Sequence, residues 1–122
     1  MMTLVRRLAC VACVLVAAGC SSPPSPSERA TSSELAQMSA LKRDYSGVVM
    51  GFDVRGDTTL LVSLDLQAYI GIDDDAAAAM RRSVAARWRS AWSAAHPGVR
   101  ATLHVRFIDF IGRKVAELTV HT

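Results

Sequence analysis

The sequence predicts an α+β fold in which two β-hairpins flank one long helix, in the order ββαββ. Apolar and polar residues alternate at period two over residues 48–66 and again over residues 103–120, which is typical of strands with one buried face. Between them, residues 73–95 repeat their apolar positions at helical spacing. We therefore expect a single small domain with a four-stranded, mainly antiparallel sheet and one long helix packed on one face.

The first predicted hairpin turns at residues 56–58. A three-residue turn places Val54 opposite Leu60 and brings the apolar residues of both strands to one face, whereas a two-residue turn would separate them. The longer turn is therefore predicted. The residues expected to face the core are Val48, Met50, Phe52 and Val54 in the first strand and Leu60, Val62, Leu64 and Leu66 in the second.

The central helix has sequence signals at both ends. Asp73 is a suitable N-cap, and Asp74 and Asp75 follow it at the positive end of the helix dipole. Pro97-Gly98 ends the helix, and His96, just before it, is expected to cap the C-terminus. The stripe predicted to lie on the sheet consists of Ala77, Met80, Val84, Trp88, Ala91, Trp92 and Ala95.

The second predicted hairpin runs over residues 100–111 and back over residues 113–121, with a turn at Ile111-Gly112. The register that agrees with the apolar pattern pairs Arg106 with Glu117 on the outer face, which is a favourable cross-strand contact. On the inner face it pairs Phe107 with Ala116 and Val105 with Leu118.

The N-terminus predicts a secretory signal rather than a membrane-spanning helix. Arg6 and Arg7 precede an unbroken apolar run of eleven residues, Leu8 to Ala18. At about 1.5 Å per residue, this run covers about half of a ~30 Å hydrocarbon core. The run closes with Val16-Ala17-Ala18-Gly19-Cys20, which resembles the lipobox of bacterial lipoproteins, with Ala17 where that family most often has leucine.

This resemblance implies a processed, lipid-anchored chain. The signal peptide, residues 1–19, is removed between Gly19 and Cys20, and the sulfur of Cys20 carries the lipid. Residues 20–33 then form the lipidated end and a serine- and proline-rich linker, because such a segment buries too little apolar surface to order itself. The α+β domain occupies residues 34–122 and starts with a short helix.

The anchor implies a location on a bacterial membrane, facing the periplasm or the cell exterior. Ser21, after the cysteine, resembles outer-membrane sorting in Gram-negative bacteria. Loss of Arg6 and Arg7 lowers the formal net charge from +3 to +1, so charge gives no support for nucleic-acid binding. Cys10 and Cys13 leave with the signal peptide, so we expect no disulfide and no cysteine nucleophile in the mature domain.

No cofactor is predicted, and metal binding has one weak candidate. His104 and His121 share the outer face of the last hairpin, with Glu117 on the same strand as His121, and two imidazoles with a carboxylate can bind a transition metal. Ordinary exposed strand residues are the favoured interpretation. The aspartates at 73–75 lack the alternate spacing, the glycine and the distal glutamate of a calcium loop.

No catalytic constellation is predicted either. The serines in regular elements lack the glycine context of a nucleophile, and Asp53 and Asp65 are interpreted as solvated strand residues. Trp88 and Trp92 are expected in the core. A solvated basic face of the helix is expected at Arg81, Arg82, Arg87 and Arg89, with contact to anionic lipid or to a partner's carboxylates as the alternative.

Four apolar residues fall on the side of the sheet expected to face solvent. They are Leu61, Ile108, Phe110 and Val115. Apolar side chains gathered on an outer face predict either a surface for a partner protein or a face covered by the N-terminal helix.

We interpret the chain as a non-catalytic, membrane-anchored accessory that binds another envelope protein, with no small-molecule ligand identifiable. A small, hydrolase-like envelope enzyme is the alternative. A third interpretation starts from residues 47–54, a turn, a second strand and the aspartate-led helix that includes Trp88, which together resemble the TonB C-terminal domain. That resemblance implies an energy-coupling or peptide-binding module.

Overall fold

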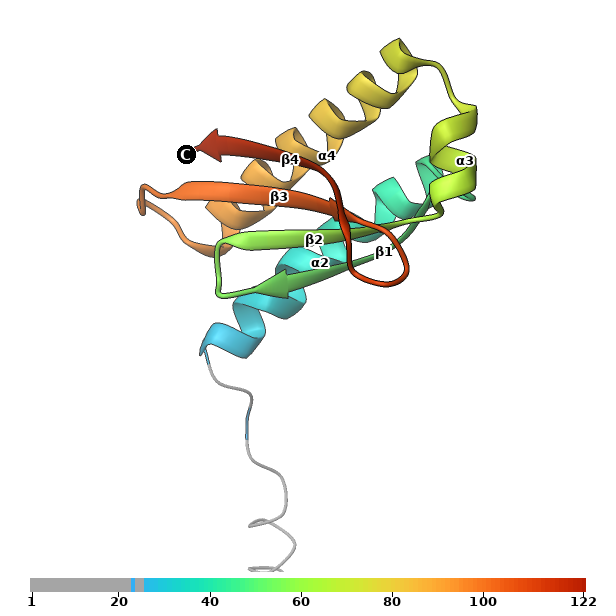
Figure 1. Ribbon diagram of the computed structural model, residues 1–122. Coiled ribbons are helices and arrows are strands. Elements are labelled where there is room, and N and C mark those ends of the chain that lie inside the picture. The colour runs from blue at the N-terminus through green and yellow to red at the C-terminus, as the bar shows by residue number, and fades with distance from the viewer. Residues whose placement is uncertain (1–22, 24–25) are drawn as a thin grey trace, which may run out of the picture.

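Four strands form one sheet in the order β1-β2-β3-β4, and two long helices lie on one of its faces (Figure 1). This computed structural model describes residue 23 and residues 26–122, so the predicted signal peptide and Cys20 lie outside the described residues. The elements are α2 (Pro26–Asp44), β1 (Val49–Arg55), β2 (Thr59–Leu64), α3 (Leu66–Gly71), α4 (Asp74–Ala95), β3 (Thr102–Ile108) and β4 (Lys114–His121). None of the described helices is long and apolar enough to cross a membrane.

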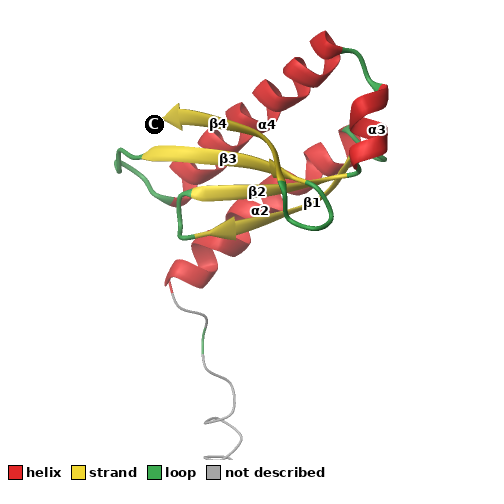
Figure 2. Cartoon of the chain, viewed as in Figure 1, coloured by secondary structure: helices red, strands yellow, loops and turns green. Residues whose placement is uncertain are grey.

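The two hairpins are joined side by side through a parallel pair of strands. β1–β2 and β3–β4 are antiparallel, whereas β2–β3 is parallel because the chain crosses over through α3 and α4. The predicted α+β class is therefore confirmed. The helical layer has two long members instead of one, because α2 packs beside α4 and against β1, and the opposite face of the sheet carries no helix of the described chain (Figure 2).

The predicted registers are confirmed in the middle of both hairpins. Val54 pairs with Leu60 across the three-residue turn, in which Gly56 and Asp57 both have positive φ (57° and 63°). Arg106 pairs with Glu117 across the second hairpin. The apolar pattern fixes these pairings because a shift by one residue would move every apolar side chain to the other face.

Two bulges change which side chains face the core. The register shifts between Val49 and Gly51, so Val49 is buried and Met50 is 57% exposed instead of facing the core as predicted. A second shift after Phe107 returns Val115 to the helix side, where it packs against the buried cluster. The prediction that Val115 lies on the outer face is therefore wrong.

Strand β2 and strand β3 each end earlier than predicted because an aspartate starts a different structure. Asp65 is the N-cap of α3 and accepts hydrogen bonds from the backbone N–H groups of Gln67 and Ala68, so Leu66 is helical and not a strand residue. In the second hairpin, β3 ends at Ile108, and Asp109 begins a turn that the predicted strand had included.

Helix α4 confirms the predicted cap and six of the seven residues of the predicted stripe; Ala95 is only half-buried, and Ala85, which was not predicted, is buried. Asp73 is the N-cap, and its side chain accepts a hydrogen bond of 2.7 Å from the backbone N–H of Ala76. His96 is the C-cap, as predicted. The buried residues of the helix are Ala77, Met80, Val84, Ala85, Trp88, Ala91 and Trp92.

Helix α2 begins inside the predicted linker. Residues 26–33 are helical, so the linker prediction is wrong for this part of the chain. Proline is tolerated in the first helical turn, where its missing N–H costs no hydrogen bond. The rest of the helix has an apolar stripe to bury, since Met38 and Leu41 are 0% and 5% exposed and Tyr45 packs against the same cluster.

Replacing Met38 with alanine should lower the free energy of unfolding by about 2–4 kcal/mol, because the substitution leaves a cavity where α2 meets the core. Urea-induced unfolding of the chain measures the change. The matched control is Lys42→Ala on the exposed side of the same helix, which should stay within about 0.5 kcal/mol of the unsubstituted chain. Equal midpoints for the two variants would show that α2 does not belong to the core.

Candidate functional site

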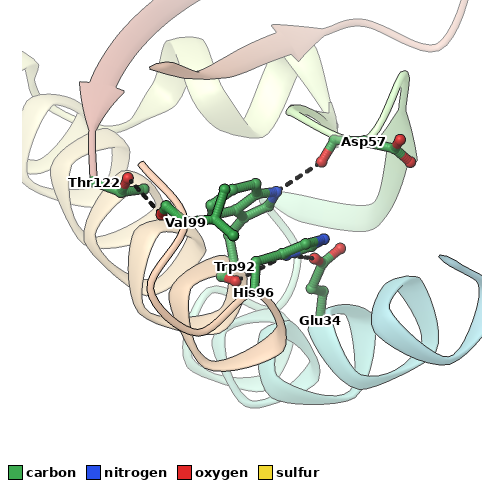
Figure 3. A network of polar contacts seen from close by, with 6 residues as sticks. All are labelled: Glu34, Asp57, Trp92, His96, Val99 and Thr122. Atoms are coloured by element: carbon green, nitrogen blue, oxygen red, sulfur yellow. Dashed lines mark hydrogen bonds and ion pairs between the residues drawn. The ribbon is translucent and has the colours of Figure 1, made fainter. Parts of the chain in front are cut away.

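A buried carboxylate joins α2 to the end of α4. Glu34 is 1% exposed, and its Oε1 lies 3.4 Å from Nδ1 of His96 (Figure 3). Oε1 makes no hydrogen bond within the described chain. A buried polar atom without a hydrogen bond is costly, so this contact is a functional candidate rather than ordinary packing.

The imidazole of His96 is held in place from two sides. Nδ1 lies 3.0 Å from the backbone oxygen of Trp92, which also accepts the His96 backbone N–H, so Nδ1 carries a proton when this contact is a hydrogen bond. The ring stacks on the Trp92 indole with a centroid distance of 4.1 Å and an interplanar angle of 16°. Trp92 Nε1 in turn donates to the backbone oxygen of Asp57 in the β1–β2 turn. The network therefore ties α2, α4 and the first hairpin together (Figure 3).

The surroundings of Glu34 change its protonation. Burial raises the pKa of the Glu34 carboxyl above its usual value; the nearby His96 opposes this rise and Asp57 adds to it. The side chain of His96 is 28% exposed, whereas that of Glu34 is 2% exposed, so the imidazole lies between the carboxylate and solvent. Hydrolysis that uses a histidine as the base needs a nucleophile in contact with the imidazole ring. In the described chain, the polar contacts of the His96 ring are with Trp92 and Glu34.

The structure does not bring the weak metal candidates together. His104 Nδ1 lies 3.4 Å from the Thr119 hydroxyl, and His121 Nδ1 lies 3.1 Å from the Thr102 hydroxyl. Glu117 instead forms ion pairs with Arg106 and Lys114, at 3.8 and 3.4 Å. Residues 26–122 hold no group of three histidine, cysteine or acidic side chains able to bind a metal ion.

The acidic and aromatic candidates have structural partners. Asp53 is exposed on β1 and pairs with Arg55 at 3.0 Å, whereas Asp65 caps α3. Trp88 and Trp92 are buried, as predicted. On α4, Arg81 donates a hydrogen bond to the Tyr69 hydroxyl of α3, so it is not part of a freely solvated basic face.

Without Val115, three residues of the predicted partner surface remain, and they lie in two separate parts of the molecule. Leu61 and Ile108 lie half-buried on the face of the sheet opposite the helices. Phe110 lies beyond the end of β3, in the β3–β4 turn, and is 85% exposed, next to Ile111 at 57%. Beside Phe110 lies a hollow of about 370 Å³ that includes Met50 in its lining.

Asp109 builds the turn that exposes Phe110. Its carboxylate is 3% exposed; Oδ1 accepts the backbone N–H groups of Ile111 and Arg113 at 3.0 and 2.9 Å, and Oδ2 accepts Arg113 Nε at 2.9 Å. Burial alone would raise the pKa of Asp109, but these hydrogen bonds and the charge of Arg113 outweigh it and lower the pKa below its usual value. The fixed turn therefore presents Phe110 and Ile111 to solvent in one conformation.

Glu34 and Asp109 are the two residues that the sequence analysis missed. Glu34 shares one helical face with Met38 and Leu41, at spacings of four and three. This spacing places the Glu34 carboxylate on the face of α2 that packs against α4. Asp109 precedes Gly112 by three residues at the start of a turn, a position where an aspartate side chain often accepts backbone N–H groups.

Replacing Glu34 with glutamine should stabilise the chain at neutral pH. The folded-state pKa of Glu34 lies above the unfolded value, near 4.5, so its contribution to stability is full below that value and is lost as the pH rises through the folded-state pKa. Glutamine has no carboxyl group to ionise, so the variant does not lose this stability as the pH rises. Its free energy of unfolding should therefore decline less than that of the unsubstituted chain over this range.

Urea unfolding from about pH 4 to about pH 8 tests this expectation. Glu117→Gln, which removes an exposed carboxylate, should retain the pH dependence of the unsubstituted chain. Parallel curves for the Glu34 variant and the unsubstituted chain would contradict the raised pKa.

Comparison with known proteins assigns no family to this arrangement. What the chain does is therefore inferred from its N-terminal sequence and from the surfaces described above. No protein-family model, no curated protein and no solved structure matches this chain.

Proposed function

We propose that this protein is a lipid-anchored, non-catalytic component of a bacterial cell envelope and that its α+β domain binds another envelope protein. The observation that carries the proposal is the lipobox-like segment ending at Cys20, followed by polar residues and then by a folded domain. A lipid on Cys20 would hold this domain at the membrane surface, facing the periplasm or the cell exterior.

The start of α2 sets how closely the domain is held. Helix α2 begins at Pro26, so five residues, 21–25, separate it from Cys20. At most about 3.6 Å per residue, this segment spans about 20 Å when fully extended. A domain held at such short range is suited to a partner that lies in or near the same membrane.

Two features of the domain support a binding role. The face of the sheet that carries Leu61 and Ile108 has no covering helix in the described chain (Figure 2). The Asp109 turn holds Phe110 and Ile111 out in a fixed conformation, which reduces the entropy lost when a partner covers them. These residues form the proposed partner surface, without Val115.

Mass analysis of the protein extracted from membranes tests the anchor. We expect residues 1–19 to be missing and acyl chains to be attached at Cys20, so that Cys20→Ala leaves the chain unprocessed or releases it from the membrane. Cys13→Ala is the matched control, because it changes a cysteine of the leader that carries no lipid. A Cys20→Ala chain that matures and fractionates as the unsubstituted chain does would refute the anchor.

Photo-crosslinking in intact cells tests the partner surface. A photoreactive amino acid at position 110 should give a discrete crosslinked product with another envelope protein, because the side chain is 85% exposed in a fixed turn. The same group at position 87, on the helical side of the molecule, is the control and should not give that product. Equal products from both positions, or none from position 110, would argue against a partner at this surface.

A further inference from the structure

A groove with unpaired positive charge runs between α4 and the outer strand β4. It has a volume of about 500 Å³ and is lined by Arg82, Ala85, Ala86 and Arg89 of α4 and by residues 118–121 of β4. The alanines leave space between the two arginines, which lie seven residues apart on one side of the helix. Leu118 and Val120, the inward-facing residues of β4, remain half-exposed in the groove.

The charge in this groove is unbalanced. Arg82 and Arg89 are exposed, and neither forms an ion pair or a hydrogen bond with another described residue. No acidic side chain lines the groove, and its other titratable group is His121. The planar donors of arginine match two oxygens of a carboxylate or of a phosphate. The charge therefore favours an acidic ligand.

The outer edge of β4 sets the shape of this ligand. β4 pairs with β3 alone and is the last strand of the sheet, so one edge of its backbone has no strand partner in the described chain. An extended segment lying along this edge satisfies the free backbone groups and covers Leu118 and Val120. The seven-residue spacing of the arginines corresponds to about 10 Å along the helix. This lies between the ~7 Å and ~13 Å that separate side chains two and four residues apart on one face of a strand, a difference that long arginine side chains can span.

We propose that the groove between α4 and β4 binds an extended acidic segment of a partner protein, with backbone hydrogen bonds to β4 and carboxylates on Arg82 and Arg89. This inference rests on the proposed binding role and gives the chemistry of one partner. It concerns a different surface from that of Phe110 and does not require the lipid.

The test uses the mature, full-length protein in detergent micelles and a fluorescent octapeptide of alternating glutamate and valine. Fluorescence anisotropy should show saturable binding, and the double variant Arg82→Gln/Arg89→Gln should weaken it about tenfold or more, because two charge-assisted contacts are lost. Arg87→Gln removes another exposed arginine, which lines the hollow between α2 and α4, and this variant should bind as the unsubstituted protein does. Unchanged urea unfolding of both variants shows that their folds are intact.

Two further peptides separate strand addition from charge attraction. N-methylation of either the odd or the even backbone nitrogens should abolish binding in one case and preserve it in the other, since alternate N–H groups of a strand face its neighbour. The octapeptide with lysine in place of glutamate should not bind.

Three results would overturn the proposal: equal binding by both N-methylated peptides, binding of the lysine peptide, or an unaffected double variant. Absence of saturable binding by the acidic octapeptide would also overturn it, and arginine-dependent binding to phosphatidylglycerol vesicles in that case would assign the groove to a lipid surface. None of these results touches the outcome at Cys20 or the crosslink at position 110, so failure here is distinguishable from failure of the proposed function.

Discussion

The packing of α4 against the sheet is the contact on which the rest of the structure depends. Trp88 lies at its centre with no exposed surface, among strand residues that are equally buried, such as Val62, Val105 and Phe107. Burying an aromatic side chain of this size contributes about 3 kcal/mol or more. This burial also leaves one polar atom unsatisfied, because the indole Nε1 of Trp88 has no hydrogen-bond partner among the described residues.

This packing also explains why one face of the sheet, here called the bare face, is covered by no helix of residues 26–122 (Figure 2). The crossover between β2 and β3 carries α4 to the helix side, and α2 follows because its apolar stripe meets α4 and β1 there. Small domains rarely leave a sheet face bare unless its side chains are polar or meet a partner. Here the bare face is mixed, with Arg106 and Glu117 paired beside half-buried Leu61 and Ile108.

The sequence predicted the elements whose signals are local and repeated. The alternation around Phe52 and Val105 and the cap at Asp73 each follow from spacing along the chain, and the structure agrees with them. The predictions fail where a single residue interrupts the regular alternation of a strand. The bulge at Met50 adds a residue to the alternation, and Asp65 offers a helix cap where the strand pattern continues in sequence. The contact between Glu34 and His96 joins residues far apart in the chain, and the sequence around one residue does not predict the other as its partner.

The parallel pairing of β2 with β3 divides the molecule into two halves. Each hairpin closes over a short stretch of chain, but Leu60 meets Val105 only after the chain has passed through α3 and α4. Contacts of such large sequence separation carry the greatest loop-closure cost and form slowly. The two hairpins pack against different helices: β1 packs against α2, whereas β3 and β4 pack against α4. We therefore expect the pairing of β2 with β3 to form after the two hairpins.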